Sequence, residues 1–452
     1  MLMARRALAT LVIALASRSA LAAAPPQDGA PAAPAARLEP VVTVRLAPGV
    51  NVEDVVDRAR AAGLPVRARG PGVLAFVDLS VESGDVAATA AALRQIPGIE
   101  LAESNAAGAY EAVTPDDPLY ADQWNLCNPG GFRATADADV DADEAWSITQ
   151  GEPGVIIAVI DTGVDATHPD LQGRLWCNPG EVAAAHDGVD NDGNGFIDDV
   201  AGWNFALGSD DIRSVSGHGT EVAGVIGARG DNGLGIAGIA GGGATSAGCT
   251  LMVLCVGDPD PLSSLLDDAI VYAVRQGARV INISFTVPRT AACAAALDFA
   301  EARNVVVVCA AGNRLATVGF PACYGCAVPV ASFGPTGELS SFSSPGAPLA
   351  QRGLAAPGEM IPTTGAGHGY AAVTGTSMAA PHVAAAVGLV LSRPAGAALT
   401  ADGVRGLLRR TADPLDAGPG LVGAGRLNIA KALQALETST TLSAPASAPR
   451  TP

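Results

Sequence analysis

Lysine is almost absent from this chain of 452 residues, and aromatic side chains make up only 4% of it. Lys431 is the one lysine, arginine supplies the other basic residues, and the formal net charge is −18. The sequence has no basic stripe that could neutralise phosphates, which argues against nucleic acid as a partner. Beyond its first residues it also has no apolar run long enough to cross a membrane, so no stable membrane insertion is expected.

Cysteine is absent outside the stretch from Cys127 to Cys326, which holds all eight. An even number behind a secretory leader favours disulfides, although the sequence does not give their pairing. Cys323 and Cys326 form a CxxC, but no second pair at metal-ligand spacing accompanies it, so zinc is not expected. Cys309 ends an apolar run, where a buried free thiol is the alternative to a disulfide.

Apolar residues, glycine and alanine are abundant instead. Nearly half of the chain is apolar, which is enough for a large core. Many glycines and alanines suit a tightly packed α/β domain in which backbones approach closely. The length indicates two or three segments.

The N-terminus has the pattern of a signal peptide over residues 1–22. Arg5 and Arg6 precede a short apolar stretch, and small residues at 19–22 offer a cleavage site. We therefore expect a secreted protein, extracellular or periplasmic, with an uncleaved anchor as the alternative. Residues 23–37 are rich in Ala and Pro and are interpreted as a disordered linker, and residues 436–452 as a low-complexity tail.

Residues 38–108 have the pattern of a small α+β domain. Strand patterns cover residues 41–46, 73–79 and 99–103, and helical spacing covers 52–62 and 86–95. This order fits a ferredoxin-like sheet. Because the segment has no cysteine and no evident catalytic cluster, we interpret it as an accessory domain.

Residues 112–435 have the pattern of a doubly wound α/β domain with a mostly parallel sheet. Apolar runs at 155–160, 251–256, 280–283 and 305–309 are continuous rather than alternating, as in parallel strands that are buried on both faces. Helical patterns lie between them, for example at 262–276 and 293–302.

Three short motifs in this domain carry chemistry. Val-Ile-Asp-Thr-Gly at 159–163 places Asp161 at the end of a buried strand, where open α/β sheets bind ligands. Gly-His-Gly-Thr at 217–220 opens an apolar helix with His218. Gly-Thr-Ser-Met-Ala-Ala-Pro-His-Val-Ala at 375–384 places Ser377 at a helix start, where backbone N–H groups favour a developing anion.

These residue types suit nucleophilic catalysis. A serine hydroxyl needs a base to remove its proton, a histidine is such a base near neutral pH, and a buried carboxylate orients the histidine. Asn313, in Ala-Ala-Gly-Asn at 310–313, could donate to an oxyanion together with the backbone N–H of Ser377. An aspartic protease would need a second Asp-Thr-Gly, and an α/β-hydrolase would have the order Ser, acid, His.

The order Asp161, His218, Ser377 and the four motifs resemble the subtilisin-like serine protease family. The resemblance covers about residues 112–435. Further matching segments are Asp116 to Pro118, Gln123-Trp124, His168 to Leu171, Phe342 to Ser344, Ala356 to Gly358 and Gly423 to Asn428.

The resemblance implies peptide-bond hydrolysis through an acyl-enzyme. Asp161 would orient His218, His218 would act as general base and acid, Ser377 as nucleophile and Asn313 as oxyanion donor. Substrate contacts would come from a further set: Ser284, Phe285, Thr286, Ala311 and Gly312. No organic cofactor is implied, and we expect a monomer.

The resemblance also makes residues 38–108 an inhibitory, chaperone-like propeptide. We expect self-cleavage between about residues 105 and 115, with the strand at 99–103 leading the chain into the active site. Two other functions stay open at this point, an esterase and a catalytically silent binding protein, and a casein digest separates all three.

The chain departs from the family after the strand at 280–283. The family usually has Ser-Leu-Gly there, and this chain has Ser284-Phe285-Thr286. Thr286 adds a branched side chain where glycine leaves space, whereas Phe285 would point to the opposite face of an extended strand. We therefore expect a narrowed pocket that prefers small residues such as Ala or Val before the cleaved bond.

An Asp/Asn/Gly-rich insertion lies between Asp161 and His218. Its alternating oxygen-bearing residues, followed by Gly195, are typical of calcium loops, although the full EF-hand pattern is not met because Ala201 stands at its twelfth position. A solvated acidic loop is the alternative. The predicted calcium ligands are Asp187, Asp190, Asp192, Asn194, Phe196 and Asp199.

Overall fold

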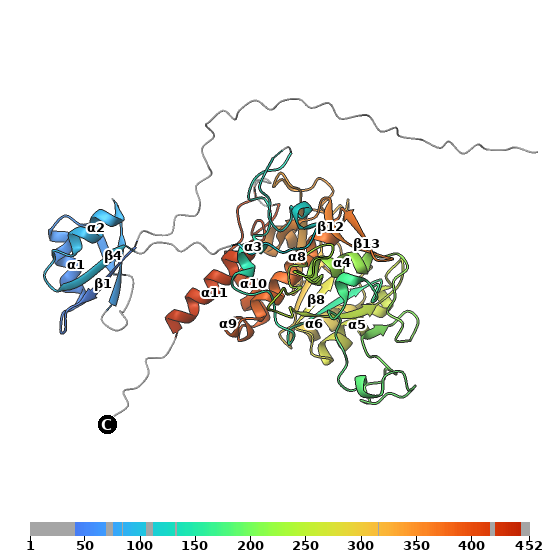
Figure 1. Ribbon diagram of the computed structural model, residues 1–452. Coiled ribbons are helices and arrows are strands. Elements are labelled where there is room, and N and C mark those ends of the chain that lie inside the picture. Colours follow the sequence, from blue (N-terminus) through green and yellow to red (C-terminus); the bar gives the residue numbers. More distant parts are fainter. Residues whose placement is uncertain are drawn as a thin grey trace, which may run out of the picture. The chain divides into compact units, whose positions relative to one another are not determined.

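The computed structural model divides the chain into two compact units, residues 1–109 and 110–452 (Figure 1). The residues that it describes are 41–68, 76–83, 85–104, 112–131, 133–314, 316–415 and 421–443. The expected signal peptide, the linker at 23–37, most of the expected cleavage stretch and the end of the tail lie outside them. No helix among the described residues is long and apolar enough to span a membrane.

The N-terminal unit is a ferredoxin-like sheet with two helices. Its elements in chain order are β1 (Val41–Leu46), α1 (Val52–Ala61), β2 (Val66–Ala68), β3 (Phe76–Val81), α2 (Val86–Leu93) and β4 (Ile99–Ser104). The strands pair antiparallel in the order β2-β3-β1-β4. Asn51 and Asp85 cap the two helices by accepting backbone N–H groups of the first turn.

The small core of this unit confirms the predicted strand and helix pattern. Val42 and Val44 of β1, Val55 of α1 and Leu93 of α2 are fully buried. Strand β2 was not predicted, because only the first of its three residues is buried and no periodicity shows. Residues 73–75 of the predicted second strand lie outside the described residues.

The larger unit is built on a seven-stranded parallel sheet in the order β11-β10-β9-β8-β5-β7-β6. All its strand pairs are parallel. The predicted doubly wound α/β fold is therefore confirmed. The strands are β5 (Ile156–Asp161), β6 (Gly202–Asn204), β7 (Thr250–Cys255), β8 (Val280–Ile283), β9 (Val306–Ala310), β10 (Val328–Phe333) and β11 (Leu354–Pro357).

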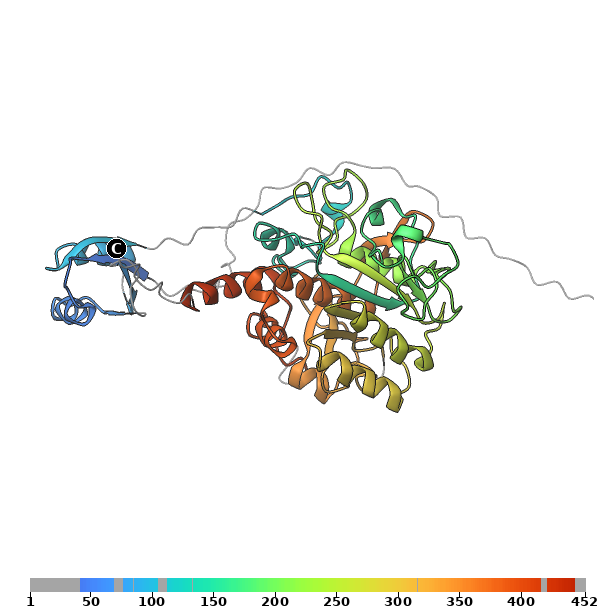
Figure 2. The ribbon, with the colours of Figure 1, turned by 90° about the horizontal axis from the view of Figure 1, so that it is seen from below.

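Two apolar cores cover the two faces of this sheet, which explains why its strands are continuously apolar. In β5, Ile157 and Val159 belong to one core, while Ala158 and Ile160 belong to the other. Figure 2 shows helices on both sides of the sheet. The first core holds α3 (Ala142–Trp146), α4 (His218–Gly227), α8 (Thr376–Leu391), α10 (Ala401–Arg410) and α11 (Ile429–Ser443), and the second holds α5 (Ser263–Arg275), α6 (Ala291–Glu301) and α7 (Ala347–Arg352).

Short elements complete the unit. Strands β12 (Ile361–Gly365) and β13 (Gly369–Val373) form an antiparallel hairpin. The remaining elements are α9 (Pro394–Ala397) and the 3-10 turns η1 (Tyr120–Asp122), η2 (Pro169–Leu171) and η3 (Val182–Ala184). The expected loose tail starts later than residue 436, because α11 buries Leu433 and Leu436 and continues to Ser443.

The connections of the sheet place a crevice beside β5. After β5 the chain adds β6 and β7 on one side, and it then crosses to β8 on the other side, followed by β9 to β11. Where the loops that follow two neighbouring strands run in opposite directions, a crevice forms at the carboxyl ends of these strands. Ligands of open α/β sheets bind in such crevices. Asp161 is the last residue of β5 and faces this position.

The cysteines correct one expectation. All eight are free thiols in this structure. Cys249, Cys293 and Cys309 are buried in the apolar cores, where they act as small apolar side chains, and Cys255 is buried at the end of β7. For Cys309, the alternative of a buried free thiol is the one that the structure supports.

Candidate active site

Asp161 is a buried carboxylate at the carboxyl end of the central strand β5. Its side chain is 1% exposed. Oδ1 accepts hydrogen bonds from His218 Nδ1 at 2.7 Å and from the backbone N–H of Thr162 at 2.8 Å. Oδ2 is also buried and has no hydrogen-bond partner in the described part of the chain. The contact with Nδ1 fixes the histidine tautomer, because that nitrogen must carry the proton.

His218 is the first residue of α4, and its ring is one-third exposed. Gly217 before it has φ +85°, a left-handed conformation that favours glycine. Burial lowers the pKa of His218, but the charge and the hydrogen bond of Asp161, with a smaller effect of Glu221, outweigh it and raise the pKa to about 9. The imidazolium form is therefore stabilised, as a base that receives a proton requires.

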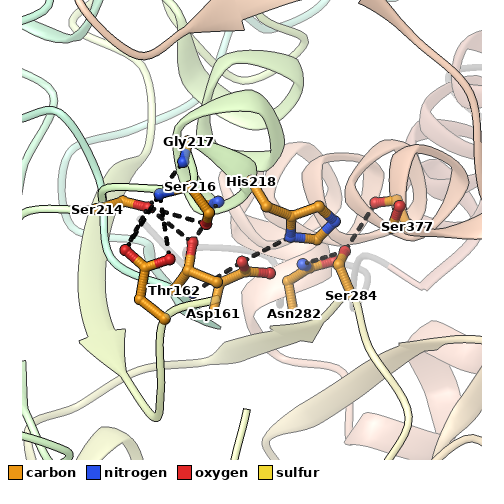
Figure 3. A network of polar contacts seen from close by, with 11 residues as sticks. Asp161, Thr162, Ser214, Ser216, Gly217, His218, Asn282, Ser284 and Ser377 are labelled. Carbon is orange, nitrogen blue, oxygen red and sulfur yellow. Dashed lines mark hydrogen bonds and ion pairs between the residues drawn. The ribbon is translucent and has the colours of Figure 1, made fainter. Parts of the chain in front are cut away.

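Ser377 lies in the first turn of α8, and Figure 3 shows the His218 ring between Asp161 and Ser377. Its backbone carbonyl accepts a hydrogen bond from Ser284 Oγ at 2.8 Å, which ties the helix start to the end of β8. A Cβ on Gly375 would lie 2.9 Å from Ser377 Oγ and 3.3 Å from Asn313 Nδ2. Glycine at position 375 therefore leaves the space between the Ser377 hydroxyl and the Asn313 side-chain amide open.

Asn313 follows β9 and presents its amide nitrogen to the same space. Its Oδ1 accepts two hydrogen bonds from Thr376, from the backbone N–H and from Oγ1, each at 3.0 Å. These two donors identify the oxygen end of the amide, so the NH₂ end is directed toward the opening beside Ser377. An N–H donor next to a serine hydroxyl suits an oxyanion.

All four residues border one cleft. Its other lining residues come from the ends of β5, β8 and β9, from the loop after β7 and from the start of α8: Thr162, Pro259, Pro261, Ser284, Phe285, Thr286, Ala310, Gly312 and Thr376. Pro259 and Pro261 were not predicted, because they belong to no recognised motif. Two expectations are corrected. Phe285 was expected on the opposite face of the strand but lines the cleft beside Thr286, because β8 ends at Ile283 and the chain bends at Phe285. Ala311 was expected to contact the substrate but is buried in the core, and Ala310 lines the cleft instead.

Comparison with known proteins agrees with this geometry. The sequence profile of the subtilase family (Peptidase_S8) matches residues 152–436. The chain belongs to the subtilase family. It is accordingly a serine endopeptidase of the subtilisin type.

Known relatives match more than two thirds of this subtilase. It is 32% identical over 326 residues to thermitase of Thermoactinomyces vulgaris. This alignment covers 71% of this chain and 99% of thermitase. The chain is 34% identical over 314 residues to the thermophilic serine proteinase of Bacillus sp. (strain AK1), spanning 69% and 67% of the two chains. Among solved structures, a protease from Pseudoalteromonas arctica PAMC 21717 matches with a TM-score of 0.56 and 27% identity, covering 72% of this chain and 99% of that one.

The acidic insertion of this subtilase brings three carboxylates together. One carboxylate oxygen each from Glu181, Asp192 and Asp199 lies within 4.8 Å of the others. Glu181 and Asp199 are fully buried, and no Lys or Arg of the described ranges forms an ion pair with the group. Burial raises the pKa of Asp199, against hydrogen bonds from Tyr272, Asn194 and Asn178. Oxygen donors crowded in this way fit a hard cation such as Ca²⁺.

The other predicted metal ligands have local roles in the same loop. Asp187 Oδ1 accepts the Val189 N–H at 2.8 Å, and the two oxygens of Asp190 accept the backbone N–H groups of Asn194 and Gly195. Asn194 Nδ2 donates to Asp192 and Asp199. The ring of Phe196 packs edge-on against Trp203, Phe205 and Tyr272. Glu181 was missed because it precedes the alternating motif.

A second acidic group was not predicted at all. Asp116, Asp117 and Asp231 bring one oxygen each within 4.8 Å of the others. Asp117 is 4% exposed, its Oδ1 has no hydrogen-bond partner in the described segments, and burial is the main cause that raises its pKa to about 6. Since Asp116 and Asp117 are far from Asp231 in sequence, no spacing could reveal this group.

Proposed function

We propose that this subtilase is a secreted endopeptidase with Ser377 as nucleophile, His218 as general base and acid, Asp161 as the residue that orients His218, and Asn313 as oxyanion donor. The observation that carries this proposal is the 2.7 Å hydrogen bond between His218 and Asp161, in the same cleft as Ser377. Support for the roles comes from the position of these residues in one cleft and from what each side chain can donate or accept.

The catalytic cycle uses these groups in turn. Ser377 Oγ attacks the carbonyl carbon of the scissile peptide, and its proton passes to Nε2 of His218. The carbonyl oxygen becomes an oxyanion beside the Asn313 amide and the backbone N–H of Ser377. Imidazolium then gives the proton to the leaving amine, the C–N bond breaks, and an acyl-enzyme remains. Water, deprotonated by His218, releases the acid by the same steps.

Substitution of the nucleophile tests this assignment. Ser377→Ala should lower casein hydrolysis to near the background rate, because the proposed acyl-enzyme forms on the Ser377 hydroxyl. Ser264→Ala, an exposed serine on α5, is the matched control and should keep full activity. Casein hydrolysis by purified Ser377→Ala at the wild-type rate would refute the assignment.

The N-terminal unit is the inhibitory propeptide in this proposal. Support comes from its separate compact fold with its own core, which lets it fold before the catalytic unit is released. We expect the enzyme to cut its own chain between about residues 105 and 115. Ser377→Ala should then remain as an uncut precursor, and N-terminal sequencing of active wild-type enzyme should place its start after residue 104.

We assign a structural calcium ion to Glu181, Asp192 and Asp199. Three carboxylates close together without a cationic partner among the described residues repel one another, and a divalent cation would offset that repulsion. The ion stabilises the insertion and takes no part in the hydrolysis. Asp187 and Asp190 shape the turn that carries Asp192.

Specificity depends on Thr286 in this proposal. Thr286 and Phe285 both line the cleft and reduce the space before the cleaved bond. We expect a graded preference for Ala or Val over Phe and Tyr at that position. The substrates are proteins and peptides, and the active form is a monomer.

A further inference from the structure

The turn that precedes His218 has little packing of its own. This pre-helix turn (Ser214–Gly217) carries Val215 with 91% of its surface exposed, and Ser216 is exposed as well. Gly217, the N-cap of α4, provides no side chain to cap the helix. Hydrogen bonds must therefore set where α4 begins, and with it the place of His218.

Asp258, three residues beyond the end of β7, supplies most of those bonds. Its carboxylate accepts the backbone N–H of Val215 through Oδ2 and that of Ser216 at 3.1 Å through Oδ1. Oδ2 also accepts the Ser214 hydroxyl at 3.3 Å. Although burial raises the pKa of Asp258, hydrogen bonds from the Ser216 side chain, from the backbone of Val215 and Ser216 and from the Ser214 side chain outweigh it, and the net pKa is lowered.

The carboxylate also fixes the direction of a chain of hydroxyl groups. A carboxylate only accepts, so Ser214 must donate to Asp258 and therefore accepts from Thr162 Oγ1, 2.9 Å away. Thr162 in turn accepts the backbone N–H of Gly219 at 3.0 Å. Ser214 Oγ accepts the N–H of Gly217 as well, also at 3.0 Å. Figure 3 shows the Ser214, Thr162 and Gly217 part of this network.

The network ends on the two residues that flank His218. The N–H of Gly217 donates to Ser214 Oγ, and the N–H of Gly219 donates to Thr162 Oγ1. The hydrogen bond from Ser214 to Asp258 sets the orientation of both hydroxyl groups. Thr162 follows Asp161 directly, so the same bonds join the carboxylate of the triad to the start of α4. Pro259 next to Asp258 lines the substrate cleft.

We propose that Asp258 is a positioning residue for the general base, acting through Ser214 and Thr162 to hold His218 in line between Asp161 and Ser377. This inference rests on the proposed roles of His218 and Ser377. It predicts that losing the carboxylate slows proton removal from Ser377 more than it weakens substrate binding.

Sulfonylation of Ser377 by a sulfonyl fluoride is the test. Ser377 Oγ bonds to sulfur, fluoride leaves, and His218 takes the proton, so the rate depends on the base and only weakly on the cleft. Asp258→Asn keeps the size but places an NH₂ group where Oδ2 accepted two donors. The rate per active site should fall about 10-fold or more, since small misplacements of a reacting group cost up to about 100-fold, while KM for a peptide ester changes less than about twofold.

Asp260→Asn is the matched control, because Asp260 is exposed on the same loop and should react like wild type. Ser214→Ala breaks the same chain at its next link, and the double variant with Asp258→Asn should lose little more than either single variant. An unchanged sulfonylation rate in folded Asp258→Asn, or additive losses in the double variant, would overturn the inference. Failure of wild type and Asp260→Asn to react at Ser377 would instead overturn the proposed triad itself.

Discussion

The active-site cleft and the Glu181–Asp199 cluster are both centred on buried carboxylates, but they are built in opposite ways. Asp161, His218 and Ser377 are far apart in sequence and stand at the ends of packed strands and helices. Glu181, Asp192 and Asp199 lie within one insertion that has little regular structure. Packed elements fix the first site without a ligand, whereas the second is a group of carboxylates in a loop, for which we propose a calcium ion.

The two sites also differ in how their carboxylates are compensated. Asp161 has a histidine partner whose pKa it raises, so charge can be generated during the reaction. Among the described residues, the donors to the cluster acids are neutral, for example Asn178, Asn194 and Tyr272. The comparison teaches that a proton acceptor and a cation site can both be made from buried carboxylates, depending on the neighbour. Each prediction below acts on one side of it.

Asp161→Asn should cause the largest effect. The amide cannot hold His218 in the required tautomer, so kcat should fall about 10⁴-fold while KM stays near wild type. Steady-state hydrolysis of a chromogenic peptide measures this. Asp268→Asn, exposed on α5, is the control. A loss below about tenfold would mean that Asp161 does not orient the base.

Asn313→Ala should follow with a loss of about 10²–10³ in kcat, the usual cost of removing one oxyanion donor. Binding of the ground state should change little, because the donor faces the oxyanion and not the bound carbonyl. A rise in KM with unchanged kcat would assign Asn313 to substrate binding instead.

The pH dependence of kcat/KM tests whether Asp161, unlike the carboxylates of the acidic cluster, acts by raising the pKa of a histidine. Because the pKa of His218 is raised to about 9, kcat/KM should rise with pH toward that value as the base becomes neutral. Glu221→Gln should lower the midpoint slightly, since Glu221 adds to the rise. The raised pKa also means that the pair stabilises the fold at pH below the ordinary histidine pKa and that this contribution is lost as pH rises through about 9. A midpoint below 6.5 in wild type would contradict this account.

Calcium should act on stability and not on the chemical step. A ligand that binds only the native state at 100 times its Kd adds about 2.7 kcal/mol, which for a unit of this size raises Tm by about 4 °C. Differential scanning calorimetry with and without a chelator measures this shift.

Two variants of the insertion locate the ion. Asp192→Asn should abolish the calcium response, whereas Asp187→Asn should keep it, because Asp187 lies outside the cluster. Equal responses in wild type and Asp192→Asn would remove the ion from this cluster.

Thr286→Gly should have the smallest effect. About one methylene in a pocket changes selectivity by roughly 1–3 kcal/mol, so the ratio of Ala to Phe cleavage should fall by about tenfold or somewhat more. Matched peptides that differ only at that residue give the ratio. If wild type prefers Phe and the variant leaves that ratio unchanged, the pocket is not narrowed by Thr286.

The buried strands of the sheet, and the catalytic motifs that follow them, could be predicted from the sequence. Continuous apolar runs predicted β5, β7, β8 and β9 within one or two residues, and the motifs after them led directly to the cleft. Strands β10 to β13 were not predicted, because proline interrupts β10 and β12, β11 and β13 are short, and tertiary pairing decides all four.

Contacts between distant loops could not be predicted in the same way. Three features depend on how loops fold back on the sheet. They are the position of Pro259 and Pro261 in the cleft, the position of Glu181 in the acidic cluster, and the approach of the Asp117 and Asp231 carboxylates. Local composition predicts a loop rich in carboxylates between Asp187 and Asp199, but it does not show which oxygens face one another. The bend at Phe285 likewise breaks the alternation that a continuing strand would have.

Mass-spectrometric mapping of a serine-reactive sulfonyl fluoride tests the central claim most directly. The account predicts one label per chain, on Ser377 alone, with casein hydrolysis lost in proportion to labelling. It also predicts no label in His218→Ala, since the hydroxyl then has no base. Full inhibition with the label on another serine, or full activity with Ser377 completely labelled, would contradict it.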